Sequence, residues 1–409
     1  MNELTGAGMR ILFVDSQFPM PDRASVDVRL WAMIRLLLDD GHACSYFAAH
    51  SAAQERSIGS DSVAAYRGAL QRLGVVTYER MAWEKVLTSA RFDVVIFKYF
   101  YAAEGRLDLL RIWQPWARAV IDSNDLVHAR LRAKAQLTGD PAHLQAAIET
   151  EKRELAAYST ADAVIAITED ESAVLGTRLP GVPLAIIPNI HAIPSAGRDE
   201  SKHPALVFVG VFSHEPNVDA VLHFHRAIWP KITSSVPGVR CTIVGGNPPG
   251  DILTLRGDNV EVTGHVPDTL PYLLRSWVSI APLRFGAGMK GKIGEAMAAG
   301  VPVVTTPVGA QGLKASIGSD LFVEEDAEGF ARRVVQLLGD APLRSRVGAA
   351  GRAFIENHYS PQAVRERLRA LIGQLEALEP KSMPLRGPRL LLRAGRLSLQ
   401  RHVLWRFQA

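Results

Sequence analysis

Two series of short, apolar, β-branched segments constrain the fold of this chain more than any other feature. Each segment is followed by a longer stretch with helical spacing, and strands that alternate with helices form parallel sheets. A chain of 409 residues also suits about two domains of roughly 150 to 200 residues. The sequence therefore predicts two doubly wound α/β domains in tandem. The expected strands are residues 10–14, 94–99, 119–123 and 163–168 in the first series, and 205–210, 241–246, 260–264, 278–283 and 302–306 in the second.

A linker separates the two series. The segment IIPNIHAIPSAGRDESKHPA, residues 186–205, contains three prolines and clustered polar residues, a composition typical of a connection without regular structure. We therefore expect an N-terminal domain over residues 1–190 and a C-terminal domain over residues 203–360. After the first strand of the second domain, Asn217 is expected to be the N-cap of a helix.

The charge is distributed unevenly along the chain. Residues 381–409 contain seven Lys and Arg residues and no Asp or Glu, whereas the whole chain has a net charge of +4. Residues 1–380 therefore carry a net charge of −3, so the globular part is mildly acidic. This balance removes the main support for nucleic-acid binding.

Hydropathy and cysteine usage indicate the cellular compartment of the protein. The chain has no uninterrupted apolar run of about 18 residues, which a membrane-spanning helix requires, and its N-terminus lacks the pattern of a signal peptide. Cys44 and Cys241 are the only cysteines and lie in apolar runs. They are expected to be buried and reduced, with no disulfide and no metal. These features predict a cytoplasmic protein.

The segment FGAGMKGKIGEAMAAG, residues 285–300, nearly matches two nucleotide-binding patterns. It follows the expected strand 278–283 and leads into a helix expected to begin near Ile293. Phosphates bind at such turns because free backbone N–H groups and the positive end of the helix point there. The dinucleotide pattern requires an acidic residue about 20 positions further on, which is absent here. The P-loop pattern requires Ser or Thr after the lysine, where this chain has Ile293.

Lys290, Lys292 and Glu295 suggest a third kind of site. The glycines allow a diphosphate to approach the backbone, and the two lysines supply positive charge where a leaving group becomes negative. Glu295 is able to accept two ribose hydroxyls. The constellation suits a nucleoside diphosphate that leaves without a metal ion. The alternative is structural, with two surface lysines and a glutamate favoured by the helix dipole.

The segment 288–313, GMKGKIGEAMAAGVPVVTTPVGAQGL, resembles the donor-binding signature of retaining glycosyltransferases of family 4. FVGVFSHEPNVDAVLHF, VTGHVPD and IAPLRFGAG are similar to other segments of that family, in the same order. PDRASVDVRL, VIDSNDLVHARLR and ADAVIAITEDE resemble its N-terminal half more loosely. The resemblance covers roughly residues 9–378. It implies the GT-B fold, in which two Rossmann-like domains face each other across a cleft.

The resemblance assigns roles by position. Lys292 and Lys290 would contact the donor diphosphate and assist catalysis, and Glu295 would bind the ribose. Backbone groups of Gly286, Ala287 and Gly288 would face the donor sugar or the phosphates. Gly264, His265 and Val266 would pass beside the base.

Three departures from the family pattern stand out. Ala287 occupies the position of the first glutamate of the family's pair, which leaves the donor sugar without its usual hydrogen bond. The loop DSQFPMPDRASVD, residues 15–27, lacks the usual glycine pair. His128 lies one position later than the family histidine, and it is either catalytic or a surface residue. Asp122 and Asp125, at the end of an apolar strand, would bind the acceptor or cap the next helix, and Asp125 is also a catalytic candidate.

The resemblance implies transfer of a sugar to an acceptor hydroxyl with retention at the anomeric carbon. The sequence identifies no carboxylate nucleophile for double displacement, so a same-face substitution fits better. In that reaction the departing diphosphate helps to deprotonate the acceptor, and the lysines stabilise its charge. No metal or other cofactor is expected.

The C-terminal region suggests the setting of the reaction. Residues 361–378 are expected to form a final helix that returns to the N-terminal domain. Beyond it, arginines interleaved with Leu, Val, Trp and Phe in the tail 381–409 favour contact with an anionic membrane surface. A glycan or lipid-linked acceptor in envelope polysaccharide or glycolipid synthesis would suit such a peripheral membrane protein.

Two other functions remain open from the sequence. A non-catalytic GT-B protein that binds a nucleotide or glycan and assists another transferase would explain Ala287 and the altered first loop. A sugar-nucleotide epimerase would need acid and base residues that the sequence does not reveal. The presence of Lys290, Lys292 and Glu295 together favours the transferase.

Overall fold

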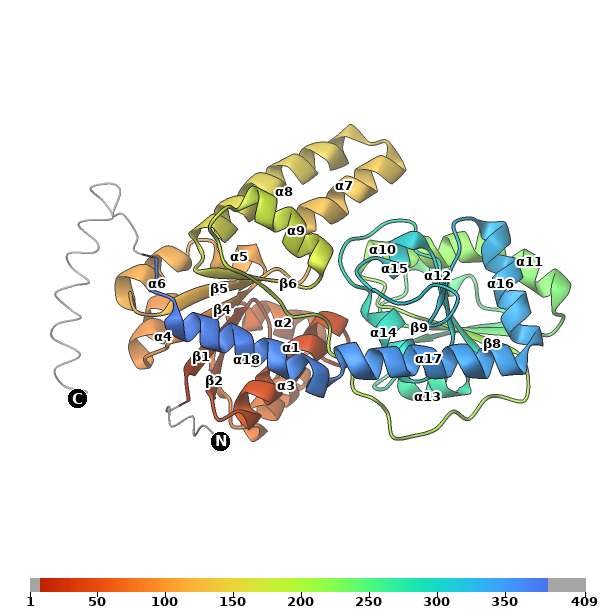
Figure 1. Cartoon of the computed structure of the whole chain (residues 1–409), viewed down its shortest axis with the longest axis horizontal. Coiled ribbons are helices and arrows are strands. Elements are labelled where there is room, and N and C mark those ends of the chain that lie inside the picture. The colour runs from red at the N-terminus through yellow and green to blue at the C-terminus, as the bar shows by residue number, and fades with distance from the viewer. Residues whose placement is uncertain (1–7, 382–409) are drawn as a thin grey trace.

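The computed structural model of the chain describes residues 8–381 and contains two α/β domains, each built on a parallel sheet (Figure 1). The predicted fold class is therefore confirmed. The strands of the N-terminal sheet are β1 (Arg10–Asp15), β2 (Ala43–Ala48), β3 (Val76–Glu79), β4 (Val94–Lys98), β5 (Arg118–Asp122), β6 (Ala163–Ala166) and β7 (Leu184–Ile186). Those of the C-terminal sheet are β8 (Ala205–Val209), β9 (Arg240–Val244), β10 (Val260–Gly264), β11 (Val278–Ala281), β12 (Val303–Thr305) and β13 (Phe322–Val323).

The order of the strands reverses once in each sheet. The N-terminal order is β3-β2-β1-β4-β5-β6-β7, and the C-terminal order is β10-β9-β8-β11-β12-β13. The reversals lie between β1 and β4 and between β8 and β11. Parallel sheets bind ligands beyond the carboxyl ends of the strands at such points, because the connecting loops diverge there. The fold therefore offers one binding crevice in each domain.

Helices flank both sheets and connect their strands. In the N-terminal domain they are α1 (Ser25–Asp39), α2 (Ser51–Ile58), α3 (Ser60–Arg72), α4 (Trp83–Ser89), α5 (Phe100–Ala103), α6 (Leu107–Trp113), α7 (Val127–Thr138), α8 (Pro141–Thr160) and α9 (Glu169–Arg178). In the C-terminal half they are α10 (Glu215–His223), a π-helical turn at Phe224–Ile228, α11 (Trp229–Ser235), α12 (Gly250–Leu253), α13 (Leu270–Arg275), α14 (Gly291–Ala298), α15 (Pro307–Ala310), α16 (Ala327–Gly339), α17 (Ala341–Tyr359) and α18 (Pro361–Ala377).

Strand β1 shows why the sheet is covered on both faces. Successive side chains of a strand point to opposite faces. Ile11 and Phe13 are buried with α1 and α18 on one face, whereas Leu12 and Val14 are buried with α4 and α6 on the other. A strand with two buried faces has a continuous apolar sequence, which is why RILFV is a strong strand signal.

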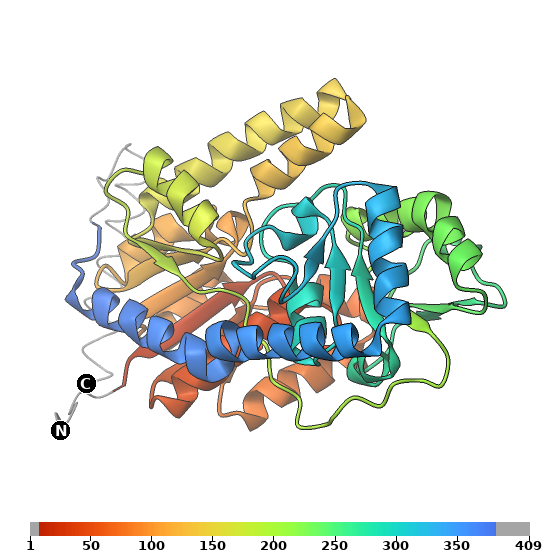
Figure 2. The ribbon, with the colours of Figure 1, turned by 45° about the vertical axis from the view of Figure 1, so that its right-hand side comes forward.

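The last two helices connect the domains. In Figures 1 and 2, α17 lies along the C-terminal domain and α18 continues from it along the N-terminal domain. Helix α18 buries five apolar residues in the core that also contains α1, namely Val364, Leu368, Leu371, Ile372 and Leu375. Arg365 and Arg369 at its surface both donate hydrogen bonds to Asp40. The hydrogen bond from Arg369 contributes most to lowering the pKa of Asp40 to about 2.

The two domains also contact each other near the linker. The Asn189 side-chain amide donates to the Met289 carbonyl at 3.2 Å. A Cβ atom at Gly294 would lie only 2.2 Å from Nε2 of His191, so α14 approaches the linker more closely than any side chain at that position allows. Burial lowers the pKa of His191 to about 4, and the ring is therefore neutral at physiological pH.

A buried ion pair ties α1, β5 and the linker together. Arg29 and Asp122 are 0% and 1% exposed, and Nη1 of Arg29 lies 2.6 Å from Oδ2 of Asp122. The remaining guanidinium nitrogens donate to the carbonyl oxygens of Ile187 and Pro188. These contacts satisfy the buried charge and fix the chain where it leaves the first domain.

Two further sequence predictions are tested by the fold. Cys44 and Cys241 are both buried free thiols, as expected. Within residues 8–381, no helix is long and apolar enough to cross a membrane. The predicted membrane-binding tail, residues 381–409, lies outside the described residues except for Lys381, whose backbone N–H donates to Asp162.

We expect Asp122→Ala to destabilise the protein by about 3 to 5 kcal/mol, because it leaves the buried Arg29 guanidinium without its counter-charge. Urea denaturation followed by circular dichroism would measure the loss. Glu328→Gln is the control: it removes the charge of an exposed glutamate that pairs with Lys231 and Arg332, and exposed ion pairs contribute little to stability. Equal stabilities of the two variants would contradict the structural role of the Arg29 pair.

Candidate functional site

The glycine-rich turn of residues 285–290 lies directly after β11 and before α14, at the reversal point of the C-terminal sheet. Helix α14 begins at Gly291, slightly before the predicted start near Ile293. Gly288 has φ = +66°, and a Cβ atom there would lie 3.2 Å from the Cβ atom of Asp125 in the other domain. The turn therefore needs glycine for its backbone conformation and for its approach to the N-terminal domain.

Lys290 and Lys292 are both partly buried at this turn. Nζ of Lys290 donates to the carbonyl oxygens of Ala287 and Gly288, at 2.9 and 2.5 Å. Burial lowers the pKa of Lys290 to about 8. Burial, assisted by the charge of Lys290, lowers the pKa of Lys292 to about 7. The site thus holds two ammonium groups that an anion would stabilise.

Asn217 holds Lys292 in place. Its side-chain oxygen accepts a hydrogen bond from Nζ of Lys292. The same Nζ atom lies 4.7 Å from the centre of the Phe208 ring. The predicted N-cap role of Asn217 is wrong: α10 begins at Glu215 with His214 as N-cap, and Asn217 lies inside the first turn. Its amide group donates instead to the carbonyl of Val211. The residue was expected to support a helix and is found to support the lysine.

Glu295 lies one turn further along α14. The hydroxyl of Thr269 donates to its Oε1 atom, and burial raises its pKa above the ordinary value for glutamate. Lys292 and Glu295 are three positions apart in the sequence and hence lie on one face of the helix.

Gly264 has φ = +78° at the end of β10, and Val266 is partly buried beyond it. Between these two, exposed His265 lies 3.4 Å from Asp22 of the first domain.

The N-terminal domain contributes side chains opposite the glycine-rich turn. His128 is 7% exposed in the first turn of α7, with its Nδ1 atom 2.6 Å from Oε2 of Glu154. Glu154 also accepts the hydroxyl of Tyr158 at 2.9 Å. Because Glu154 engages Nδ1, a ligand in the cleft would meet Nε2 of His128. The sequence placed His128 near the cleft but gave no sign of Glu154, which is 26 residues away.

Asp125 and Glu171 lie beside His128. Asp125 is 8% exposed and pairs with Arg130 at 3.1 Å, while its Oδ1 atom has no hydrogen-bond partner in the described part of the chain. Burial raises the pKa of Asp125, and it raises the pKa of Glu171 to about 7. By contrast, Asp122 is used in the buried pair with Arg29 described above, so its contacts are structural.

The end of the first strand is organised differently from the glycine-rich turn. Lys98, at the end of β4, contacts Asp15 at 2.8 Å and Asp27 at 2.5 Å. Burial disfavours the ammonium form of Lys98, but the two carboxylates outweigh it and raise its pKa. The first loop, which lacks the glycine pair, therefore fills the reversal point of its own sheet with an ion cluster.

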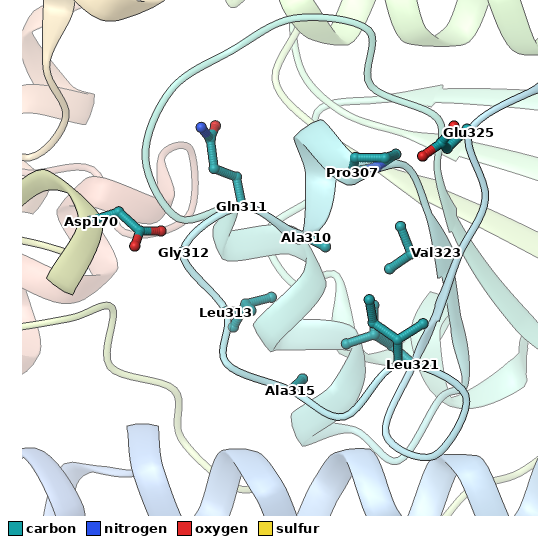
Figure 3. A pocket seen from close by; sticks show the side chains of 11 residues that line it. Asp170, Pro307, Ala310, Gln311, Gly312, Leu313, Ala315, Leu321, Val323 and Glu325 are labelled. Carbon is teal, nitrogen blue, oxygen red and sulfur yellow. The ribbon is translucent and has the colours of Figure 1, made fainter.

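Two adjoining cavities form the cleft. A cavity of about 150 Å³ is lined by Leu126, His128, Ala129, Thr168, Asp170, Glu171 and Val174 of the first domain and by Ala287, Gly288, Gln311 and Gly312 of the second. A larger one, about 520 Å³, lies between Asp170 at one end and Glu325 at the other (Figure 3). Both cavities share Asp170, Gln311 and Gly312. They are therefore neighbouring compartments, and apolar Leu313, Leu321 and Val323 line the larger one.

The predicted site residues thus fall into three groups. The two lysines, Glu295 and the glycines lie together on the turn and on α14. Gly288 of this turn lines the smaller cavity opposite His128 and lies against Asp125 of the other domain. Asp122 lies in a structural pair. Among residues 8–381, no group of three or more His, Cys, Asp or Glu side chains is arranged to hold a metal ion.

Comparison with known proteins identifies the kind of domain that carries the glycine-rich turn. The model of the family described as Glycosyl transferases group 1 matches residues 203–340, so the second domain is of this kind. A lipopolysaccharide core biosynthesis glycosyltransferase, LpsE of Rhizobium meliloti, is 28% identical over 165 residues. The alignment covers 37% of this chain and 46% of LpsE, so the chain spans less than half the length of that relative.

Solved structures match over most of the chain. A sucrose-phosphate synthase from Thermosynechococcus elongatus is 16% identical, with a TM-score of 0.67 over 90% of this chain and 99% of that one. HepE from Anabaena, in complex with UDP-glucose, is 14% identical, with a TM-score of 0.65 over 90% and 100% of the two chains. These similarities establish the GT-B fold for both domains together.

The depressed pKa of Lys292 predicts a specific pH dependence of stability. Between pH 7 and the ordinary value of 10.5, the unfolded chain binds more protons at this group than the folded one. The buried Lys292 side chain therefore destabilises the folded protein most below pH 7, and this destabilisation disappears as the pH rises. In unliganded protein, we expect Lys292→Met to increase the free energy of unfolding by about 1 to 2 kcal/mol at pH 6 and by less at pH 9.

Urea denaturation at both pH values tests this expectation, with Lys231→Met as the control for loss of an exposed lysine. The control should show no comparable pH-dependent gain. A loss of stability in Lys292→Met that is the same at pH 6 and pH 9 would contradict the account of a desolvated ammonium group.

Proposed function

We propose that the protein is a retaining glycosyltransferase that moves a sugar from a nucleoside diphosphate donor to an acceptor hydroxyl. The observation that carries this proposal is the pair of partly buried lysines on the glycine-rich turn, whose ammonium forms are disfavoured until an anion binds. The match of residues 203–340 to Glycosyl transferases group 1 supports the same conclusion.

The diphosphate binds on the turn and at the N-terminus of α14. There the backbone N–H groups of the first helical turn lack intrahelical partners and favour negative charge. Lys290 now donates to carbonyl oxygens of the turn, and Lys292 donates to Asn217. Phosphate oxygens are stronger acceptors than these neutral groups, so the lysines transfer their hydrogen bonds to the ligand. Glu295 binds the ribose, and Gly264 to Val266 border the base.

The reaction is a same-face substitution at the anomeric carbon of the sugar. The bond from that carbon to the diphosphate oxygen breaks, and the acceptor oxygen bonds to the same face. The acceptor proton passes to the departing diphosphate. Lys290 and Lys292 stabilise the charge that grows on the leaving group, and two fixed cations at this point supply the charge without a metal ion.

The acceptor enters through the larger cavity. This compartment adjoins the smaller one at Gln311 and Gly312, so a glycan there places a hydroxyl next to the donor. The role of LpsE in lipopolysaccharide core biosynthesis favours a glycan or lipid-linked acceptor in envelope synthesis. The reaction would then take place at the cytoplasmic face of the membrane, with the basic tail 381–409 as the membrane contact.

A ligand screen tests the proposed donor class. Thermal-shift measurements with UDP, GDP, ADP and dTDP, without metal, should show selective stabilisation by one diphosphate. We expect Lys292→Met to weaken binding of that diphosphate about 10- to 100-fold, because a charged hydrogen bond of about 1.5 to 3 kcal/mol is lost. Lys231→Met, which removes an exposed lysine of the same domain, should bind like the wild type.

Transfer is measured next with the sugar esters of the selected diphosphate, and the anomeric configuration of the product is read by NMR. An inverted product would contradict retention. Binding of the diphosphate without transfer to any glycan acceptor would favour the non-catalytic partner. Full affinity in Lys292→Met would overturn the assignment of the diphosphate site.

A further inference from the structure

The glycine-rich turn is unable to recognise a sugar through its side chains. Residues 285–289 read Phe, Gly, Ala, Gly and Met, so every side chain of this segment is apolar or absent. A sugar attached to a diphosphate on this turn would lie immediately beyond the phosphates. Its hydroxyls need polar partners when they leave water. Apart from the backbone of the turn and Gln311, which lines the smaller cavity from the same domain, those partners have to come from the opposite domain.

Glu171 approaches the turn from that domain. It is 7% exposed on the first turn of α9, and its Oε2 atom accepts the backbone N–H of Ile167 at 3.1 Å. Its Oε1 atom is buried and has no hydrogen-bond partner among residues 8–381. This oxygen lies 3.3 Å from the point where a Cβ atom at Gly288 would be. A buried carboxylate oxygen without a partner requires an explanation, and for Glu171 its position beside the glycine-rich turn points to a ligand.

The surroundings of Glu171 form a small compartment in which apolar Leu126 and Val174 lie among polar groups. Its volume of about 150 Å³ is many times the space of about 10 to 15 Å³ that one water molecule needs. His128 lines the same cavity, and Asp125 lies beside it with its own unpartnered Oδ1 atom. Glu171 and His128 thus line one space next to Gly288, and several polar groups around one space suit a polyhydroxylated ligand.

Glu171 also has a structural role, which has to be separated from ligand binding. Its backbone N–H donates to the hydroxyl of Thr168 at 3.0 Å, and its carboxylate returns to the backbone N–H of Ile167. This arrangement resembles a capping box at the start of α9. The cap uses one carboxylate oxygen and leaves the other free. Because a glutamine side chain also has an acceptor oxygen, Glu171→Gln preserves the cap.

We propose that Glu171 recognises the sugar of the donor: Oε1 accepts a hydrogen bond from a sugar hydroxyl in the compartment beside Gly288. This inference rests on the proposed transferase function and adds a sugar-binding residue from the other domain. It makes the donor a bridge, because the diphosphate is bound by the second domain and the sugar by the first. A free nucleoside diphosphate contacts Lys290 and Lys292 but does not reach Glu171.

The experiment compares two ligands by isothermal titration calorimetry. The first is the diphosphate selected from UDP, GDP, ADP and dTDP, and the second is its glucose, galactose, mannose or N-acetylglucosamine ester, whichever the wild type binds best. In Glu171→Gln, we expect affinity for the ester to fall about fivefold, since a neutral acceptor replaces a charged one. In Glu171→Ala the fall should be about 10- to 100-fold. Affinity for the free diphosphate should not fall in either variant, and it is expected to rise slightly because the negative charge of Glu171 that acts on Lys290 is removed.

Glu169→Gln is the matched control. Glu169 is exposed on the same helical turn and pairs with Lys314 of the other domain, so this variant removes one charge from the helix start and one contact between the domains. It should bind both ligands like the wild type. The comparison separates sugar recognition from helix capping and from closure of the cleft.

The outcomes distinguish the two proposals. If wild type binds a diphosphate and an ester, and both Glu171 variants keep the wild-type ratio of affinities, the role of Glu171 is overturned while the transferase proposal stands. Equal losses for diphosphate and ester in Glu171→Gln also overturn it, because they indicate a structural role. A wild-type protein that binds none of these nucleotides overturns the proposed function and, with it, this inference.

Discussion

The close approach of glycine backbone in one domain to side chains of the other is the constraint on which the site depends. Gly294 leaves no room for a side chain against His191, and Gly288 lies against Asp125 and Glu171. Larger residues at these positions would push the domains apart. The glycines therefore serve two purposes: they shape a turn that admits a phosphate, and they let the opposite domain reach the ligand. The segment FGAGMKGKIGEAMAAG nearly matches two unrelated nucleotide patterns because glycine is needed at several of its positions.

The charges of the cleft are arranged at a cost in stability. Lys290 and Lys292 lose hydration without gaining a full counter-charge, and Asp125 and Glu171 each keep an oxygen without a partner. Arg29 and Lys98 are also buried, but they have counter-charges in Asp122 and in two carboxylates. A buried oxygen without a partner among the described residues also occurs in the structural pair, at Oδ1 of Asp122, so the distinguishing feature of the cleft is that two such carboxylates and two desolvated lysines gather at one place.

The sequence predicts the fold and one side of the site well. Strands β1, β4, β8 and β11 have continuous apolar sequences, and these strands define the reversal points in both sheets. Four strands were not predicted: β2 reads ACSYFA, β3 reads VTYE, β7 has three residues and β13 has two. Their pairing with a neighbour, more than their own composition, keeps them in the sheet. Lys290, Lys292 and Glu295 were identifiable because they lie on one continuous turn and helix.

The other side of the site was less accessible to sequence reasoning. Glu171 has a local signal, the Thr168–x–x–Glu171 spacing of a capping box, but that signal indicates a helix start and not a ligand. Its position beside Gly288 depends on how the domains close. Glu154 reaches His128 because α7 and α8 fold back on each other. Asn217 was expected to cap a helix, yet its side chain holds Lys292. Each of these contacts joins segments whose proximity is set by tertiary structure alone.

The central claim is that a sugar nucleotide bridges the two domains. Hydrogen–deuterium exchange tests it most directly, because backbone protection is measured in both walls of the cleft at once. The account predicts that a free nucleoside diphosphate slows exchange in the second domain alone, in residues 264–266 and 286–294, whereas its sugar ester also slows exchange in residues 167–175 of the first domain. Protection of residues 167–175 to the same extent by both ligands, or by neither, would contradict it.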